Sequence, residues 1–416
     1  MKRDLRFIIE IDSIRRVVMK FERFFSETAK KAKASAIREL LKLVSKPEIT
    51  SLAGGLPDPA TFPKEQIKKI SSEVIDKYGD RALQYGITEG IPELREWLGK
   101  NFAGKDVSLD NVIITSASQQ GLDLIGNVFI DPGDPIIVEL PTYLGGISAF
   151  KMYDARFIGV KLDDDGLIID ELKDKIISLK KEGKKPKFLY TVSNFHNPAG
   201  VTLSLERRKE ILDIAKENDF LIIEDDPYHF INFKGEDVPS IYSLDTDDRV
   251  ILLGTFSKIL TPGFRLGWIF GPEEILYKIV QLKQAKDLCT NTFVQYIAYE
   301  YANTGAMEEH FDLIVKIYKE KRDVMLSALN KYFPKEVKWT KPEGGFFVFA
   351  YLPEYIDADK MFYDAIEENV AYVIGSAFYP DGSGKNTMRL SFCYPSKEQI
   401  EEGIKRLGSV IRKKIK

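Results

Sequence analysis

The side chain with the clearest capacity for chemistry is Lys258, which follows a strand-like apolar segment and lies among Thr255, Ser257 and Thr261. In open α/β sheets the carboxyl ends of the strands face the ligand. A lysine amine attacks an aldehyde when burial or a neighbouring cation lowers its pKa. Arg265 is such a cation and also suits a phosphate group. Taken alone, Lys258 is more readily interpreted as a surface lysine, because the chain has many.

Two other predicted strands end in polar side chains. Asp225 closes a strand at 220–224, where a carboxylate can pair with a protonated pyridine nitrogen, and Tyr228 can donate to a phenolate oxygen. Asn197 belongs to an Asn-Pro-x-Gly sequence after a strand at 187–191 and would place an amide at the same edge. The alternatives are an acidic, helix-capping turn at Asp225 and a simple turn at Asn197.

A predicted strand-to-helix junction and a buried arginine add two anion sites. Ser118 and Gln119 open a helix, whose unpaired backbone N–H groups suit a phosphate, and an ordinary serine N-cap is the alternative. Arg389 lies in an apolar strand, so its guanidinium requires a partner. That partner is either the carboxylate of an amino-acid substrate or an internal Asp or Glu. No Walker-type loop and no Gly-x-Gly-x-x-Gly after a strand is present, which leaves ATP and dinucleotides unsupported.

The bulk composition is that of an ordinary globular protein, with 416 residues, 44% hydrophobic residues and a net charge of −3. It predicts no attraction to nucleic acid or to anionic membranes. Two cysteines and three scattered histidines predict a reducing cytoplasm and no metal site. No apolar run approaches the ~18 residues of a membrane span. Residues 1–18 are too interrupted by charges for a signal peptide. We interpret them as a dispensable extension or a mis-set start codon, with an amphipathic arm on a partner subunit as the alternative.

Strand and helix patterns alternate through the first three-quarters of the chain and predict a mainly parallel sheet covered on both faces. The predicted strands lie at 111–115, 135–139, 156–161, 187–191, 220–224, 249–254 and 266–271. The predicted helices lie at 26–45, 65–78, 119–129, 144–152, 169–181, 204–217 and 272–286. After about residue 291 come a long helix at 308–332, strands at 337–340, 345–351, 371–374 and 387–392, and a final helix at 396–413.

These segments together resemble the fold-type I, class I aminotransferases that depend on pyridoxal 5′-phosphate (PLP). They are most similar to the subgroup of 2-aminoadipate, kynurenine and archaeal aromatic or multi-substrate aminotransferases. The resemblance begins near Phe24 and continues to the C-terminus. It implies an α/β fold with a large PLP-binding domain at 62–299, built on a mainly parallel seven-stranded sheet between helices. It also implies a smaller α+β domain at 300–416 with an N-terminal segment at 21–61, after an extension at 1–20.

The resemblance also implies roles for single residues. Lys258 matches the lysine that forms the Schiff base with PLP and moves protons during transamination. Asp225 matches the partner of the pyridine nitrogen, and Asn197 and Tyr228 match the residues that bind the 3′-oxygen. Tyr143 matches the aromatic side chain stacked on the ring. Five residues match the cup that holds the cofactor's phosphate: Ser118, Gln119, Thr255, Ser257 and Arg265.

Further matches concern the substrate and a second subunit. Arg389 matches the arginine that binds the substrate α-carboxylate, and Gly54 and Gly55 match a loop that passes close to the substrate. Arg38 matches an arginine that meets an acidic substrate side chain, and a solvent-facing arginine is the alternative. Tyr85 matches a tyrosine that reaches the phosphate from the neighbouring subunit, which implies a homodimer with shared active sites.

The activity implied by the resemblance is a ping-pong transfer of an amino group. The donor is an aromatic amino acid, kynurenine or 2-aminoadipate, and the acceptor is a 2-oxo acid, with 2-oxoglutarate expected. Ala117, His196 and Ile374 depart from residues usual in the subgroup, and substrate preference stays open. The alternatives are a PLP-dependent β-lyase or decarboxylase on the same fold, and the PLP-binding module of a transcription regulator. About 25 residues before the expected fold are too few for the winged helix of such a regulator.

Overall fold

The computed structural model describes residues 21–31, 48–236 and 238–415. Residues 21–31 belong to a unit of their own, with a short 3₁₀ helix, η1 (Glu22–Phe24), and helix α2 (Glu27–Lys31). All other described residues belong to a second unit, which contains both main sheets. The predicted helix at 26–45 lies mostly outside the described residues, and the predicted domain boundaries stay a prediction.

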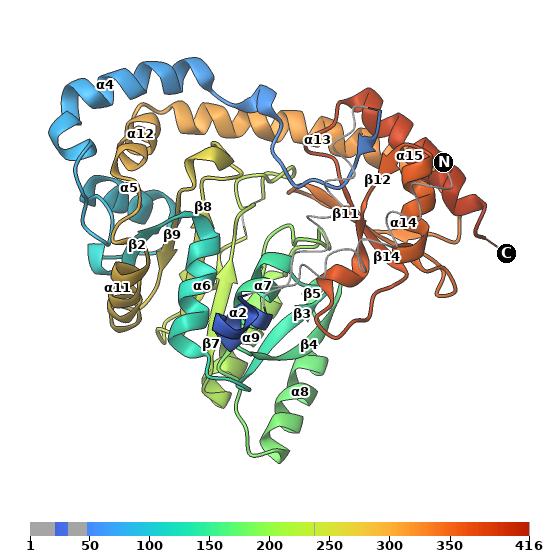
Figure 1. Ribbon diagram of the computed structural model, residues 1–416, viewed down its shortest axis with the longest axis horizontal. Helices are drawn as coiled ribbons and strands as arrows, with labels where there is room; N and C mark the ends of the chain where they lie inside the picture. Colours follow the sequence, from blue (N-terminus) through green and yellow to red (C-terminus); the bar gives the residue numbers. More distant parts are fainter. Residues whose placement is uncertain (1–20, 32–47, 237, 416) are drawn as a thin grey trace. The chain divides into compact units, whose positions relative to one another are not determined.

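The second unit is built on an eight-stranded sheet (Figure 1). Its order is β2-β9-β8-β7-β6-β3-β4-β5, and β9 is the one reversed strand among the seven longer ones. Its strands are β2 (Val112–Thr115), β3 (Pro135–Leu140), β4 (Arg156–Asp163), β5 (Gly166–Leu167), β6 (Phe188–Thr191), β7 (Leu221–Asp225), β8 (Val250–Thr255) and β9 (Gly267–Phe270). The mainly parallel sheet is therefore confirmed.

The expected number of seven strands is corrected to eight. The additional strand, β5, has only two residues and forms an antiparallel hairpin with the end of β4. Asp164 and Asp165 form the turn between the two strands, and Gly166, the first residue of β5, has a φ of +95° that allows the chain to leave the turn. So short a pair gives no apolar run in the sequence, which is why the pattern does not predict it.

Both faces of this sheet are buried, because neighbouring residues on each strand enter different hydrophobic cores. Ile222 and Leu252 belong to one core, and Ile223 and Ile251 belong to the other. The second core is completed by α6 (Ala117–Phe129), α7 (Leu144–Lys151) and α11 (Glu273–Asp287) (Figure 1). The first is covered by α5 (Pro92–Phe102), α8 (Ile169–Lys181), α9 (Leu205–Asn218) and α10 (Ile241–Leu244).

A second, antiparallel sheet lies in the C-terminal part of the chain. Its order is β10 (Lys338–Trp339), β11 (Phe347–Tyr351), β14 (Thr387–Ser391) and β13 (Val373–Ile374). The predicted strand at 371–374 is wrong as a single strand. Its first part, β12 (Val370–Ala371), pairs in parallel with β1 (Thr50–Ser51), whereas β13 pairs with β14. Tyr372 separates the two strands and donates to the carbonyl of Ala358 at 2.5 Å.

The remaining helices surround these sheets. They are α4 (Lys64–Ala82), α12 (Thr292–Asn303), α13 (Ala306–Tyr332), α14 (Ala358–Glu367) and α15 (Lys397–Arg412). The long helix α13 runs from the neighbourhood of α12 to α15, beside the second sheet (Figure 1). Among the described residues, no helix combines the length and apolar character needed to cross a bilayer.

Candidate active site

Several predicted residues lie at one edge of the eight-stranded sheet. β6, β7 and β8 are parallel neighbours, and β2 runs in their direction because both β2 and β8 are antiparallel to β9. Asp225 is the last residue of β7, and Lys258 follows β8 by three residues. Asn197 lies in the loop after β6, and Ser118 lies in the first turn of α6, which follows β2. The structure therefore brings these four residues to the same edge.

Lys258 has the environment of a nucleophilic amine. Its Nζ donates to the carbonyl oxygen of Gly55 at 2.9 Å. The pKa of Lys258 is lowered to about 8, chiefly by burial. Cys393 opposes this shift, and the charges of Arg389 and Arg265 contribute to it. About a tenth of the amine is therefore unprotonated at pH 7, far more than for an ordinary lysine, and this is the form that attacks an aldehyde.

Asp225 offers one carboxylate oxygen to a ligand. Its Oδ2 accepts a hydrogen bond from the hydroxyl of Tyr190 at 2.8 Å, whereas the buried Oδ1 has no hydrogen-bond partner among the described residues. Burial raises the pKa of Asp225 to about 7, although the bond from Tyr190 opposes this. The capping contacts of the acidic turn belong instead to Glu224, which accepts from the backbone N–H groups of Ile241 and Tyr242. Oδ1 of Asp225 is therefore available to accept a hydrogen bond from a buried cationic N–H group.

Arg389 is buried without a carboxylate partner among the described residues. Nη1 donates to Oδ1 of Asn197 and Nη2 to the carbonyl of Ala53, both at 2.8 Å, while the buried Nε has no hydrogen-bond partner. Its guanidinium lies over the ring of Phe347 at 4.1 Å, and burial lowers the pKa of Arg389 to about 10. The alternative of an internal Asp or Glu partner is not found in the described part of the chain.

Two tyrosines stand close to these charged groups. Tyr143 precedes α7, and its ring covers Gly145, where a β-carbon would come within 2.3 Å of the ring. Tyr228 is fully buried, with its ring edge-on to Phe346 and Phe347. Burial raises the pKa of both phenols, so both are neutral hydrogen-bond donors near neutral pH.

The residues predicted to form the phosphate cup come from two segments. Thr255 is the last residue of β8 and Ser257 follows it by two residues; the hydroxyl of Thr255 donates to that of Ser257 at 2.9 Å. Ser118 and Gln119 lie in the first turn of α6, where backbone N–H groups lack a partner within the helix. Arg265 is exposed and has a φ of 49°, and its guanidinium donates only a long bond of 3.4 Å to Pro262.

The remaining predicted residues lie in different surroundings. Gly55 is packed so closely that a β-carbon would come within 2.8 Å of Phe347, whereas a β-carbon at Gly54 would meet nothing nearer than 3.7 Å. Tyr85 is 78% exposed on the turn between α4 and α5, so the structure does not bring it into the cluster of its own chain. Arg38 lies outside the described residues.

Two residues of the site were not predicted. Tyr190 is the next-to-last residue of β6 and binds Asp225. Its polar hydroxyl in an otherwise apolar strand was a usable signal. Cys393 lies near Lys258 and hydrogen-bonds to the carbonyl of Leu56 at 3.0 Å, which fixes the loop of Gly54 and Gly55. A single cysteine after a strand gives no comparable signal.

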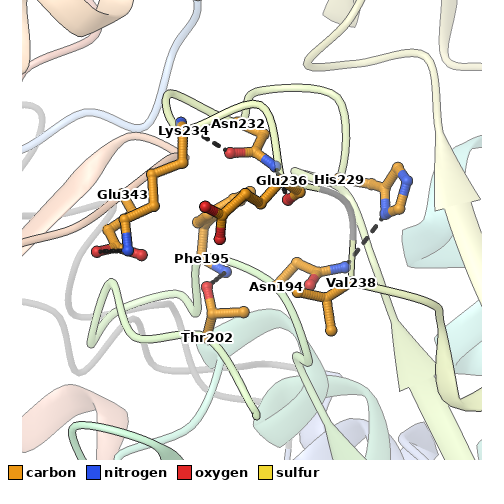
Figure 2. A pocket seen from close by; sticks show the side chains of 9 residues that line it. All are labelled: Asn194, Phe195, Thr202, His229, Asn232, Lys234, Glu236, Val238 and Glu343. Atoms are coloured by element: carbon orange, nitrogen blue, oxygen red, sulfur yellow. Dashed lines mark hydrogen bonds and ion pairs between the residues drawn. The ribbon is translucent and has the colours of Figure 1, made fainter. Parts of the chain in front are cut away.

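A small cavity of about 60 Å³ lies apart from these residues (Figure 2). It is lined by side chains from the segments after β6 and β7 and by Glu343, which forms an ion pair with Lys234 at 2.6 Å. None of the residues predicted for the site lines this cavity. Its volume suits water rather than a cofactor.

Comparison with known proteins agrees with this geometry. The profile of the family "Aminotransferase class I and II" matches residues 51–407. The chain belongs to this family of aminotransferases. The aromatic-amino-acid aminotransferase 1 of Thermococcus litoralis is 50% identical over 95% of this aminotransferase and 96% of its own length. The 2-aminoadipate transaminase of Thermus thermophilus is 40% identical over 93% and 96% of the two chains.

Solved structures show the same relationship. The kynurenine aminotransferase of Pyrococcus horikoshii, determined in complex with PMP, is 51% identical with a TM-score of 0.92, and the match covers 96% of this aminotransferase and 99% of that chain. The fold is that of the fold-type I aminotransferases, and PLP is the cofactor of this enzyme. The residues present suit PLP, because a buried oxygen of Asp225 has no partner in the described part of the chain and Lys258 has a lowered pKa.

Proposed function

We propose that this aminotransferase attaches PLP at Lys258 and binds the α-carboxylate of its substrates with Arg389. The observation that carries this proposal is the buried guanidinium of Arg389, which has an unpaired Nε and no acidic partner among the described residues. A buried arginine of this kind is suited to a planar carboxylate, which it binds through two hydrogen bonds. Arg389 donates to the carbonyl of Ala53 and Lys258 to the carbonyl of Gly55, so both side chains bind the same short loop.

Each remaining residue has one task in this proposal. When bound, PLP supplies the electron sink that makes the Cα–H bond of an amino acid acidic. Asp225 keeps the ring nitrogen protonated through Oδ1, and Asn197 and Tyr228 hold the ring oxygen. Tyr143 covers the ring face. Lys258, once its amine is free, would take the proton from Cα of the substrate and donate it to the carbon atom of PLP that receives the amino group.

The phosphate group of PLP has its own set of ligands in the proposal. The hydroxyl groups of Ser118, Thr255 and Ser257, the first turn of α6 and the charge of Arg265 together provide hydrogen-bond donors and positive potential. Gln119 belongs to the same turn and donates to the carbonyl of Gly145 at 3.3 Å.

We further propose that the amino donors are aromatic amino acids, kynurenine or 2-aminoadipate. A 2-oxo acid accepts the amino group in a ping-pong reaction, and 2-oxoglutarate is the acceptor that we expect. The support comes from the names of the relatives, which are aromatic-amino-acid, kynurenine and 2-aminoadipate aminotransferases. Arg38 is proposed to meet an acidic donor side chain, and Gly54 and Gly55 to line the substrate space.

A homodimer with shared active sites is also proposed. Leu83, Tyr85 and Ile87 all expose large apolar side chains on one short turn, as expected for a surface that a second subunit covers. Tyr85 would reach the phosphate group of the partner's cofactor. A cytoplasmic location is proposed as well, because both cysteines are free thiols.

A half-reaction screen tests the proposed activity. The PLP form of the enzyme is mixed with single amino acids, and the absorbance band of the bound cofactor is followed. Aromatic amino acids, kynurenine or 2-aminoadipate are expected to bleach the band and to release their 2-oxo acids, and 2-oxoglutarate should restore it. A band that no amino acid bleaches would contradict the proposal. Product formation that continues beyond one equivalent of enzyme without any added 2-oxo acid would indicate a β-lyase or a decarboxylase.

A further inference from the structure

A chain of hydrogen bonds connects the proposed phosphate loop, residues 116–119, to a buried lysine of α11. The backbone N–H of Ser116 donates to Oε1 of Gln120 at 2.7 Å, and Nε2 of Gln120 donates to Oδ2 of Asp287 at 2.6 Å. Nζ of Lys283 donates to both carboxylate oxygens of Asp287, at 3.0 and 3.2 Å. This series of hydrogen bonds thus joins α6 to α11 and ends at the backbone of the loop.

The ion pair of Lys283 and Asp287, at the α11 end of this series, is held in place by burial. The side chain of Lys283 is 0% exposed, and a buried ammonium group requires a charged partner. Asp287, the last residue of α11, provides it. Because Lys283 occupies both oxygens of Asp287, the carboxylate has a defined orientation and presents Oδ2 to Gln120. The ion pair also cancels a carboxylate charge that would otherwise repel a phosphate dianion.

The near end of the chain is a loop that needs such support. Ala117 has a φ of 60°, a left-handed conformation that side-chain-bearing residues rarely adopt unless their surroundings hold it. Strand β9 passes close by, since a β-carbon at Gly267 would lie 2.8 Å from the carbonyl carbon of Ala117. The bond from Ser116 to Gln120 fixes the loop on its other side. With the N–H of Ser116 occupied, the N–H groups of the following turn are those left for an anion.

We propose that Gln120, Asp287 and Lys283 are positioning residues that hold residues 116–119 in the conformation that binds the 5′-phosphate group of the cofactor. This inference rests on the phosphate site proposed above. Gln120 is hydrogen-bonded to both the buried ion pair and the loop, and it does not itself contact the phosphate. Its removal should therefore weaken the binding of the phosphate group selectively.

A pair of ligands separates this role from a general structural one. PLP and pyridoxal share the ring and differ in the phosphate group. The free ligands are the same for every variant, so the change in the ratio of their dissociation constants between two variants measures the change in the phosphate contribution. Both constants are measured by absorbance titration for the wild-type enzyme and for Gln120→Met, which keeps the volume of the side chain and removes both hydrogen bonds. The expected result is a Kd for PLP raised about tenfold and a Kd for pyridoxal changed by less than about twofold.

Asp123→Asn is the matched control. Asp123 also links α6 to α11, through its ion pair with Lys286, but the described hydrogen bonds of its side chain go to Tyr153 and Lys286 and not to the loop. Both dissociation constants should stay at their wild-type values in this variant. The double variant Lys283→Met with Asp287→Leu, which leaves no buried charge unpaired, is the second test if Gln120→Met does not fold. It should show the same selective loss of PLP affinity.

Two results would overturn the inference. In one, Gln120→Met weakens PLP and pyridoxal by the same factor, which would give Gln120 a structural role only. In the other, both constants are unchanged. A wild-type enzyme that binds pyridoxal as tightly as PLP would instead contradict the proposed phosphate site, so the two failures are distinguishable.

Discussion

The guanidinium of Arg389 donates from Nη1 to the amide oxygen of Asn197 at 2.8 Å. This bond joins β14 of the second sheet to the loop after β6 of the first. It also fixes which end of the Asn197 amide is available, because the oxygen is occupied and the NH₂ group remains as the donor. Arg389, which we propose binds the substrate carboxylate, is therefore hydrogen-bonded directly to Asn197, which we propose binds the cofactor oxygen.

Replacing Arg389 with lysine should reduce binding of the substrate carboxylate. A lysine cannot form two parallel hydrogen bonds, and the loss of about 3 kcal/mol for a charge-assisted pair corresponds to a decrease of roughly a hundredfold in kcat/KM. The measurement is kcat/KM for an aromatic amino acid and for 2-oxoglutarate. A variant that loses activity with one substrate only, or with neither, would contradict the assignment.

Asp225→Asn should separate stability from catalysis. Asp225 is an acid whose folded pKa, about 7, is above its ordinary value of 3.8, so its buried charge destabilises the protein without PLP increasingly as the pH rises from about 4 to 7. The neutral variant should be more stable than the wild type at pH 8, as measured by denaturant unfolding of both proteins without cofactor. Its amino-transfer rate should fall on the order of a hundredfold or more, because the ring nitrogen loses its charged partner. Equal rates would contradict the role of Asp225.

The two neighbouring glycines should respond differently to alanine. A β-carbon at residue 55 would come within 2.8 Å of Phe347, whereas one at residue 54 would make ordinary contacts at 3.7 Å. Gly55→Ala should therefore lower the free energy of unfolding by about 1–3 kcal/mol and displace the carbonyl that binds Lys258. Gly54→Ala should change stability by less than about 0.5 kcal/mol. Urea unfolding of both variants checks this, and equal effects would contradict the packing described for Gly55.

The lowered pKa of Lys258 should appear in the pH dependence of stability without PLP. Its folded pKa of about 8 lies below the ordinary 10.5, so the unfolded chain binds more protons between these values and stability rises with pH across that window. Below about pH 8 the buried amine costs about 3 kcal/mol. Lys258→Met should be more stable than the wild type at pH 7, and the difference should shrink by pH 10. A difference that does not change with pH would contradict the shift.

Much of the fold could be predicted from apolar runs, because the central strands bury both faces and leave no polar residue at alternate positions. Helix α14 was not predicted, although its buried residues Met361, Phe362 and Ala365 have helical spacing and Asp357 caps it. The division of the predicted strand at 371–374 into β12 and β13 could not be predicted, since each pairs with a different strand that is distant in sequence. Lys258, Asp225 and Asn197 could be predicted because they lie at or just after strand ends. Gln120 acts through a contact between α6 and α11, which no local pattern records.

Reduction of the PLP-loaded enzyme with borohydride, followed by peptide mass spectrometry, tests the central claim most directly. The lowered pKa of Lys258 and its position after β8 predict a single phosphopyridoxyl group on the peptide that contains Lys258, and none on that peptide in Lys258→Ala. A label on a different lysine of the wild-type enzyme, or a covalently labelled Lys258→Ala variant with the same stoichiometry, would contradict it.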